Sequence, residues 1–221
     1  MTDEKARTWL TESLNVSRET MERLDQFEAF LREEAKLQNL ISASTLDNIW
    51  MRHIFDSAQL LALLPKSRLS GKWLDLGSGA GFPGLVAAII THSPVTLVES
   101  RARRIDYLER AVELLDLQEN VTVAGKRLER LEAAPFAVIS ARAFAPLPQL
   151  LRLAARFSTD NTCWLLPKGR NAARELAEVQ KQREWRGRLD FKIEASLTDA
   201  DAGILTGRLL GQKLAKKRKK A

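Results

Sequence analysis

The sequence is poor in the residues that hold disulfide-bonded or zinc-bound domains together. Its 221 residues include one cysteine, Cys163, and two histidines, His53 and His92. A single cysteine excludes an internal disulfide, and so few Cys and His residues argue against a Cys/His zinc site. We therefore expect no metal centre.

Long apolar runs are also missing. No run reaches the roughly 18 residues that a membrane-spanning helix needs, and residues 1–7 are polar and lack the apolar region of a signal peptide. We therefore expect a cytoplasmic protein that does not enter a membrane. With 45% hydrophobic and 29% charged residues, the composition is typical of a globular protein with a well-filled core, and nothing in it indicates an obligate protein partner.

Positive charge is concentrated in residues 213–221, which hold five lysines and one arginine and no acid. The whole chain has a net charge of +7, so the body without these six cations carries only +1. Such a tail is either a solubilising terminus or an arm that contacts phosphates. On the second interpretation Lys216, Lys217 and Arg218 are candidate RNA-binding residues.

The order of apolar patterns predicts a helical segment followed by an α/β domain. Residues 1–64 are expected to be helical, with one face formed by Met21, Leu24, Phe27 and Leu31. A second helix is expected from Leu46 to Leu64, capped by Thr45 or Asp47. The turn-rich stretch 65–71 marks the boundary, so we expect a helical segment at 1–64 packed on a core at 65–212, with the basic tail beyond.

Within the second region, strand and helix patterns alternate. Helices are expected near 83–90, 105–115, 147–157 and 171–183, and strands at 72–76, 95–99, 121–124, 137–141, 163–166, 190–196 and 204–210. Five β–α alternations predict a mostly parallel sheet with helices on both faces. The last two strands have no long helix between them, which predicts an antiparallel hairpin at one edge. Ligands of such sheets bind outside the carboxyl ends of the strands.

A glycine-rich loop, DLGSGAGFPG at residues 75–84, follows the first predicted strand. Glycines let the backbone turn sharply and approach a ligand closely, and Glu99 ends the next strand, where an acid can accept hydrogen bonds from both ribose hydroxyls of a nucleoside. The spacing of Gly79, Gly81 and Gly84 formally matches the dinucleotide fingerprint. However, the glycines start at Gly77, and D-x-G-x-G-x-G resembles motif I of S-adenosylmethionine-dependent methyltransferases, which we favour.

The chemistry expected after the fourth strand, at residues 140–146, narrows the methyl acceptor. The (D/N)-P-P-(Y/F) motif of exocyclic-amine methylation is absent, and Cys163, the one candidate nucleophile for a pyrimidine carbon, lies inside an apolar strand pattern. A ring nitrogen with a free lone pair needs only in-line placement against the methyl sulfonium. The sequence is therefore compatible with ring-nitrogen methylation.

Five segments together resemble one family. Residues 74–84 resemble motif I of the RsmG family, also called GidB; the others are Asn39–Ser42, the W-x-R-H-x-x-D-S pattern at Trp50–Ser57, the R-A-x-A pattern at Ala141–Ala145, and Lys168-Gly169. The resemblance covers about residues 20–212. It implies a Rossmann-like class I methyltransferase fold with seven strands, S-adenosylmethionine as methyl donor, and a bacterial enzyme that methylates N7 of one guanosine of 16S rRNA near the decoding site.

The expected site residues combine this resemblance with the loop pattern. Arg142 and Lys168, after the fourth and fifth strands, are the candidate catalytic residues, acting by positioning with no general base identified. Arg142 is otherwise a structural ion pair, and Lys168 otherwise solvent-exposed. The expected cofactor-binding residues are Asp75, Gly77, Ser78, Gly79, Gly81, Phe82, Glu99, Leu128, Glu129 and Arg142.

RNA contact is expected from scattered cations as well as from the tail. Arg101, Arg103 and Arg104 stand at the start of a predicted helix, where its dipole disfavours cations, which suggests anion contact. The full set of candidate RNA-binding residues is Arg52, Arg101, Arg103, Arg104, Lys168, Arg170, Lys216, Lys217 and Arg218. Phe144 is either a stacking platform for the target base or a core residue.

Two further questions stay open on the sequence. His53 and Asp56 lie three apart on one predicted helix face, as a structural hydrogen-bonded pair or as part of the cleft. The rival functional classes are a small-molecule methyltransferase of the same fold and a non-catalytic RNA-binding protein. The partner expected on the favoured reading is 16S rRNA or the small ribosomal subunit.

Overall fold

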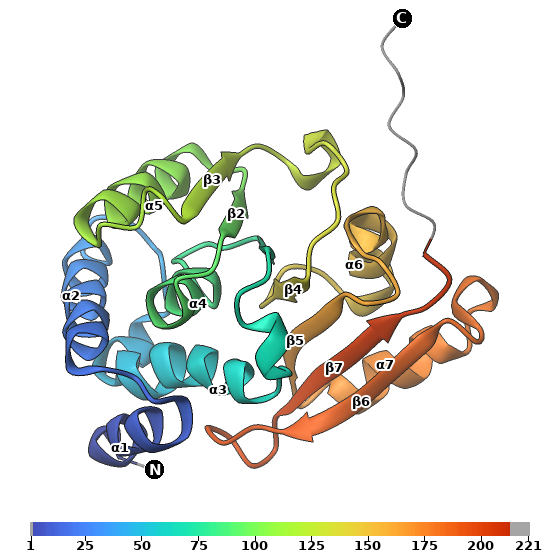
Figure 1. Cartoon of the computed structure of the whole chain (residues 1–221), viewed down its shortest axis with the longest axis horizontal. Coiled ribbons are helices and arrows are strands. Elements are labelled where there is room, and N and C mark those ends of the chain that lie inside the picture. The colour runs from blue at the N-terminus through green and yellow to red at the C-terminus, as the bar shows by residue number, and fades with distance from the viewer. Residues whose placement is uncertain (1, 213–221) are drawn as a thin grey trace, which may run out of the picture.

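A computed structural model describes residues 2–212, and a single sheet runs through its centre (Figure 1). Seven strands follow the order β3-β2-β1-β4-β5-β7-β6. The strands are β1 (Trp73–Leu76), β2 (Val95–Glu99), β3 (Val121–Gly125), β4 (Val138–Ala141), β5 (Cys163–Gly169), β6 (Leu189–Ala195) and β7 (Gly203–Leu209). The strands from β1 to β5 pair in parallel, and β7 pairs antiparallel with both β5 and β6. The predicted fold class is confirmed, including the terminal hairpin.

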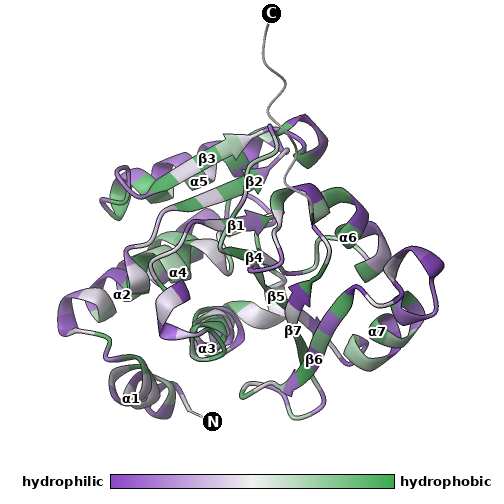
Figure 2. Ribbon diagram, turned by 45° about the vertical axis from the view of Figure 1, so that its right-hand side comes forward, coloured by the Kyte–Doolittle hydropathy of each residue, from purple (hydrophilic) through white to green (hydrophobic). Residues whose placement is uncertain are grey.

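Helices cover both faces of the sheet, and each layer has its own apolar core (Figure 2). One layer holds α1 (Asp3–Leu14), α2 (Arg18–Glu34), α3 (Asp56–Ala62), α4 (Gly84–Thr91) and α5 (Ala102–Leu114). The other holds α6 (Leu147–Ala154), α7 (Ala172–Gln180) and the short turns η4 (Leu128–Arg130), η5 (Ala155–Phe157) and η6 (Arg183–Trp185). The N-terminal helices thus share one continuous core with α4 and α5.

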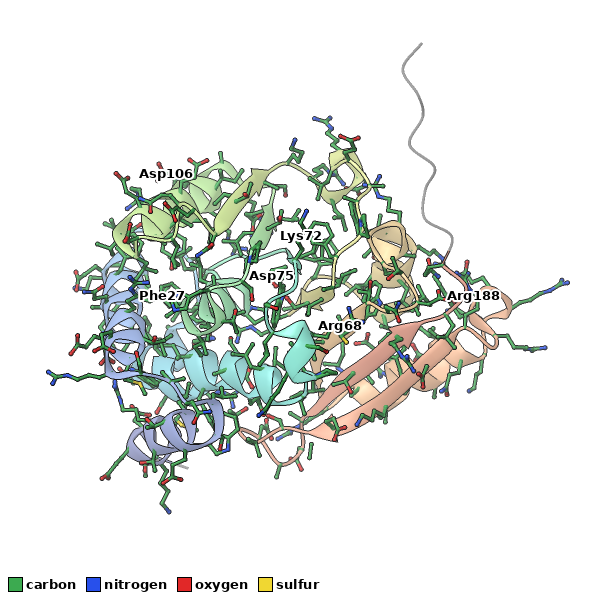
Figure 3. The ribbon with its side chains drawn as sticks, viewed as in Figure 1. Phe27, Arg68, Lys72, Asp75, Asp106 and Arg188 are labelled. Carbon is green, nitrogen blue, oxygen red and sulfur yellow. The ribbon has the colours of Figure 1, made fainter. Side chains whose placement is uncertain are left out.

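Helix α2 shows how an amphipathic pattern places an element. Leu24, Phe27 and Leu31 are fully buried, and Phe27 projects inward from the helix in Figure 3. The Ser17 hydroxyl accepts a hydrogen bond from the Thr20 N–H at 3.2 Å and caps the helix. Burying three such side chains contributes on the order of 5 kcal/mol before the entropy of ordering is subtracted.

The prediction of one helix over 46–64 was wrong. The chain forms a 3-10 turn η1 (Ala43–Asn48), a π-helical turn η2 (Trp50–Phe55) and then α3, with a further short turn η3 (Lys66–Arg68) before β1. Neither Thr45 nor Asp47 caps a helix: the start of η1 has no side-chain cap, and the Thr45 hydroxyl instead bonds to His53. Apolar spacing cannot distinguish a π turn from an α turn, because the extra residue per turn still leaves most apolar side chains facing the core.

Strand β5 runs longer than predicted and ends with an irregularity that matters for the site. Pro167 pairs with Ile204, whereas Gly169 pairs with the adjacent Gly203. Lys168 is therefore an extra residue between two paired positions, as in a β-bulge, which redirects a side chain at the end of a strand.

The parallel strands lead away from the centre of the sheet in two directions. From β1 the chain continues to β2 and β3 on one side, and from β4 it continues to β5 on the other. The carboxyl ends of β1 and β4 are adjacent, since Leu76 pairs with Ala141. Ligands of open α/β sheets bind at this kind of switch point.

Candidate active site

The glycine loop leaves β1 at this switch point and bends over a buried carboxylate. Asp75 is fully buried, and its side chain accepts hydrogen bonds from the Ser140 hydroxyl at 2.6 Å and the Gly84 N–H at 3.2 Å. Figure 3 places Asp75 in the middle of the molecule. Burial raises the pKa of the Asp75 carboxyl, although its hydrogen bonds oppose the shift. Asp75 therefore ties the start of α4 to β1 and β4.

The loop needs glycine where its backbone has positive φ and a neighbour is close. Gly77 has φ of +67°, and a Cβ there would lie 2.6 Å from Cδ2 of Phe144. Gly81 has φ of +92°, and a Cβ there would lie 2.5 Å from Leu85. The loop consequently presents bare backbone at Gly77, directly against the segment that follows β4.

A pocket of about 320 Å³ opens beside this loop, at the carboxyl ends of β2 and β3. Its wall includes the buried Glu99, whose carboxylate accepts hydrogen bonds from the N–H groups of Ser100 at 2.7 Å and Arg101 at 3.0 Å, and from Gly79 at 3.2 Å. We call it the Glu99 pocket. Its lining residues are Gly77, Val98, Glu99, Ser100, Arg101, Arg104, Lys126, Arg127, Leu128, Glu129, Ala143, Phe144, Ala145, Gln149 and Leu153.

The Glu99 pocket suits a nucleoside that carries a charged amino-acid tail. An acid at the end of β2 accepts from ribose hydroxyls, apolar Leu128 and Leu153 offer a surface for a flat base, and the Gly77 backbone leaves space that any side chain would fill. These residues therefore fit S-adenosylmethionine.

A second, larger pocket of about 650 Å³ lies on the other side of the segment after β4. Ala143, Phe144 and Ala145 line both pockets, so this segment is their shared wall. We call it the Arg142 pocket. Its lining residues are Thr45, Arg52, His53, Asp56, Arg142, Ala143, Phe144, Ala145, Pro146, Pro167, Lys168, Gly169, Glu175, Ser196, Thr198, Asp199, Ala202, Gly203 and Ile204.

Arg142 leaves the end of β4 and is held by η2 and the first residue of α3. Its guanidinium donates to His53 Nδ1 at 3.0 Å, to the Arg52 carbonyl at 3.3 Å and to Asp56 Oδ2 at 3.5 Å. It also lies over the Phe82 ring, with Cζ 5.0 Å from the centroid. Desolvation lowers the pKa of Arg142, but the pKa of a guanidinium is so high that it stays charged.

His53 is neutral in this environment. Its residue surface is only 9% exposed, and its ring stacks on Phe82 with centroids 5.1 Å apart. Burial first, and then the cations Arg142 and Arg52, lower the pKa of His53 to about 3. His53 therefore accepts a hydrogen bond from Arg142 near neutral pH and does not compete with it as a second cation.

The Lys168 ammonium is used to brace the shared wall. It donates to the Ala145 carbonyl at 2.8 Å and lies 3.0 Å from Glu175, and its side chain is only 8% exposed. The same Glu175 oxygen accepts from the Leu147 N–H at 2.7 Å. The alternative of a solvent-exposed Lys168 is thus wrong, because the bulge at the end of β5 turns the side chain inward.

Comparison with known proteins settles the family. Residues 20–200 match the family model GidB, described as rRNA small subunit methyltransferase G. The chain belongs to this family. Proteins named ribosomal RNA small subunit methyltransferase G are 49% identical in Zymomonas mobilis, over all of both chains, and 54% identical in Erythrobacter litoralis, over 94% of this chain and 96% of that one.

Solved structures agree on the fold. A putative O-methyltransferase from Klebsiella pneumoniae superposes with a TM-score of 0.60 at 17% identity, over 91% of this chain and 95% of that one. An RNA methyltransferase from Salinibacter ruber, in complex with S-adenosyl-L-homocysteine, has a TM-score of 0.54 at 11% identity, over 74% of this chain and 95% of that one. The predicted GidB family and class I methyltransferase fold are both confirmed. As a GidB member the protein is an rRNA small-subunit methyltransferase that uses S-adenosylmethionine.

The GidB chain gathers its predicted site residues around the two pockets. Of the predicted cofactor-binding residues, Gly77, Glu99, Leu128 and Glu129 line the Glu99 pocket, and Arg142 lines the Arg142 pocket. Asp75, Ser78, Gly79, Gly81 and Phe82 line neither pocket. Apart from Gly79, which is not among the buried residues, these are buried behind the loop surface, with Phe82 forming the support on which Arg142 and His53 pack.

The predicted RNA-binding residues are divided among several places. Arg52 and Lys168 line the Arg142 pocket, whereas Arg101 and Arg104 line the Glu99 pocket. Arg103 lies exposed on α5 outside both, and the exposed Arg170 lies 3.0 Å from Asp201. Lys216, Lys217 and Arg218 fall outside the described residues.

Sequence reasoning missed several residues of the GidB site. Lys126 and Arg127 follow β3 directly, so the rule that ligands meet the carboxyl ends of strands would have found them. Thr45, Thr198 and Asp199 carry no such signal. They reach the Arg142 pocket from a 3-10 turn and from the β6–β7 hairpin, which only the tertiary fold brings to this edge.

Two general features were searched within residues 2–212. This part of the chain contains no cluster of three His, Cys, Asp or Glu side chains arranged to hold a metal ion. None of its helices is long and apolar enough to cross a membrane.

Proposed function

We propose that this enzyme transfers the methyl group of S-adenosylmethionine to N7 of a single guanosine of 16S rRNA, within the small subunit of a bacterial ribosome in the cytoplasm. The observation that carries the proposal is the pair of pockets on either side of Ala143–Ala145. We assign the Glu99 pocket to the cofactor and the Arg142 pocket to the target base. Methyl transfer then takes place across the shared wall, at the switch point of the sheet.

The polar groups of the Arg142 pocket favour a methyl acceptor that needs no base. His53 accepts from Arg142 and is neutral, Asp56 is paired with Arg142, and Glu175 is paired with Lys168. N7 of guanine is such an acceptor, because its lone pair is free and it has no proton to lose. S-adenosylmethionine supplies a methyl group on a sulfonium; the N7–carbon bond forms as the carbon–sulfur bond breaks, and the positive charge passes to the guanine ring. The protein contributes position and orientation.

Within this proposal each residue has a defined task. Glu99 accepts from the ribose hydroxyls, the Leu128–Glu129 segment borders the adenine, and the Gly77 backbone leaves room for the methionine part. Arg142 orients the substrate beside the transferred methyl, and Lys168 keeps the wall from shifting. The remaining loop residues predicted to bind the cofactor, Asp75, Ser78, Gly79, Gly81 and Phe82, shape the cradle from behind.

We assign RNA contact to cations on the rims of both pockets. Arg52 stands at the Arg142 pocket, and Arg101, Arg104, Lys126 and Arg127 stand at the Glu99 pocket. The exposed Arg103 and Arg170 and the tail cations Lys216, Lys217 and Arg218 extend the contact. A paired N7 lies in the deep groove of A-form RNA, so we expect the enzyme to receive an unpaired base turned out of a loop.

The decisive experiment is transfer of a radiolabelled methyl from S-adenosylmethionine to small subunits from a strain that lacks the enzyme, followed by aniline cleavage. Cleavage at one guanosine of 16S rRNA establishes both the substrate and the N7 position, because methylation at N7 makes the ring labile. Incorporation without cleavage refutes N7 as the target atom. Absence of incorporation, with cofactor binding intact, favours a small-molecule substrate instead.

A further inference from the structure

The orientation of Arg142 depends on a segment that lies about ninety residues earlier in the chain. Three acceptors surround its guanidinium: His53 Nδ1, the Arg52 carbonyl and Asp56 Oδ2. Two of these belong to the π turn η2, and Asp56 follows it as the first residue of α3. Because Arg142 and His53 both pack on the Phe82 ring, the guanidinium and the imidazole are also fixed by a common surface.

Hydrogen bonds run in one direction through His53. A neutral imidazole carries one N–H, and Nδ1 faces a guanidinium that has only donors, so Nδ1 accepts and the proton is assigned to Nε2. His53 Nε2 lies 2.9 Å from the Thr45 hydroxyl, which in turn donates to the Ser42 carbonyl at 2.9 Å. The sequence Arg142 to His53 to Thr45 to Ser42 therefore leaves each of its members with a defined role.

The second oxygen of Asp56 attaches another distant segment. Asp56 Oδ1 accepts from the Thr198 hydroxyl at 2.7 Å and from the Gln59 amide at 2.9 Å. Gln59 Oε1 accepts from the Leu197 N–H at 2.7 Å. The loop between β6 and β7 is thus docked on the same carboxylate that holds Arg142, and this loop forms the far side of the Arg142 pocket.

This arrangement leaves part of Arg142 free. A guanidinium has five N–H donors in a fixed fork, and within residues 2–212 its Nε has no hydrogen-bond partner, although Arg142 lines the pocket. Fixing one side of the fork determines where the other side points. A donor held in this way suits an acceptor oxygen of the RNA next to the target ring, and it leaves the N7 lone pair unblocked.

We propose that His53 and Asp56 are positioning residues for methyl transfer, which lock the Arg142 guanidinium in one orientation toward an RNA acceptor oxygen. The inference rests on the proposed function. It assigns to the N-terminal segment an essential part of the active site, because η2 and α3 supply both residues while the glycine loop and strands supply the rest.

Two substitutions at His53 separate its two hydrogen bonds. In His53→Asn the amide oxygen is bonded to the same Cγ as Nδ1 and keeps an acceptor for Arg142, whereas His53→Gln places its polar atoms near Nε2 and removes that acceptor. We expect His53→Gln to lower the single-turnover rate of methyl transfer to small subunits about 10²-fold, and His53→Asn to stay within about threefold of wild type. The dissociation constant of S-adenosylmethionine and the melting temperature should change little. His92→Gln, at the exposed end of α4, is the control for loss of a histidine.

Asp56 offers an independent test. Asp56→Asn keeps an oxygen for Thr198 and Gln59 and turns an amide N–H₂ toward Arg142, so it cuts only the contact with the guanidinium. We expect a loss similar to that of His53→Gln. Thr198→Val removes the loop contact and keeps the Arg142 contact, so it should weaken apparent affinity for the small subunit more than the maximal rate.

The background variant Arg142→Ala decides between positioning and a general structural role. If His53 acts through Arg142, His53→Gln causes no further loss of rate in this background. A further loss of similar size in Arg142→Ala, or equal rates for His53→Asn and His53→Gln, overturns the inference. Wild type is measured first: wild-type enzyme without methyl transfer refutes the proposed function, whereas active wild type with an active His53→Gln refutes only the positioning role.

Discussion

Gly77 and Phe144 meet so closely that no side chain fits between them: a Cβ on Gly77 would lie 2.6 Å from Cδ2 of Phe144. The two residues come from loops after β1 and β4, which are adjacent strands. Phe144 lines both pockets, and Gly77 lines the Glu99 pocket. Their contact therefore joins the cofactor side of the site to the substrate side.

Gly77→Ala should weaken binding of S-adenosylmethionine at least about tenfold, because the new methyl group meets Phe144 and the backbone must leave its φ of +67°. Gly77→Val should abolish binding. Calorimetric titration of the cofactor measures both effects. Gly187→Ala is the matched control, since Gly187 has a similar φ of +70° but no atom within 4 Å of a Cβ. Normal affinity in a folded Gly77→Ala variant would contradict this view of the loop.

Glu99→Gln should raise the dissociation constant of S-adenosylmethionine by about 10- to 10²-fold, the cost of weakening charge-assisted hydrogen bonds to the ribose. The penalty should disappear when the ligand is an analogue without ribose hydroxyls. That second measurement separates ribose recognition from the support that Glu99 gives to the Gly79 N–H. Glu113→Gln, exposed on α5, serves as the control.

The pH dependence of stability should carry a signature of His53. Its pKa is about 3 in the folded protein and near 6.5 in an unfolded chain. The unfolded state therefore binds a proton first as pH falls, so His53 contributes stability above pH 6.5 that is lost as pH falls toward 3. Between those limits the loss approaches about 1.4 kcal/mol per pH unit.

Denaturant unfolding of wild type and His53→Asn at pH 7 and pH 4.5 tests this. The difference in unfolding free energy between the two proteins should shift in favour of the variant at the lower pH. Acid effects on the carboxylates are common to both and cancel. His92→Asn should behave like wild type, since His92 is exposed at the end of α4. Parallel pH profiles for wild type and His53→Asn would show that His53 titrates normally.

Replacing the six cations of residues 213–221 by glutamine should weaken RNA binding and flatten its salt dependence. Each phosphate contact to single-stranded RNA contributes about 0.7 to the slope of log affinity against log salt, so the slope should fall by up to about 4. The substitution keeps the length of the tail, and affinity for S-adenosylmethionine should not change. An unaltered salt slope would assign the tail to solubility.

Much of this site was visible in the sequence because the relevant signals are local. The loop at 75–84 and Glu99 follow strands that alternate with helices, and the parallel topology requires the ends of such strands to meet at one edge. The same logic placed Arg142 and Lys168 near each other, and both line the Arg142 pocket. The hairpin was predictable because no helix separates its two strands.

Other features follow from distances that sequence does not encode. The interruption of the predicted helix at 46–64 into η1, η2 and α3 turns His53 and Asp56 toward Arg142. Apolar periodicity reports only which residues face the core, and Trp50, Ile54 and Phe55 are buried in the π turn as they would be in an α-helix.

By itself the sequence determined the family, the order of strands and helices, the glycine loop and the concentration of charge in the tail, because composition, periodicity and motif spacing are properties of neighbouring residues. Only the tertiary structure decided how the guanidinium of Arg142 is oriented and what Lys168 does. Arg142 receives its acceptors from η2 and α3, and the loop between β6 and β7 joins them through Thr198. A bulge turns Lys168 inward to Glu175. These contacts join segments far apart in the chain, and they form only where packing of the helices on the sheet brings hydrogen-bonding groups within about 3 Å of each other.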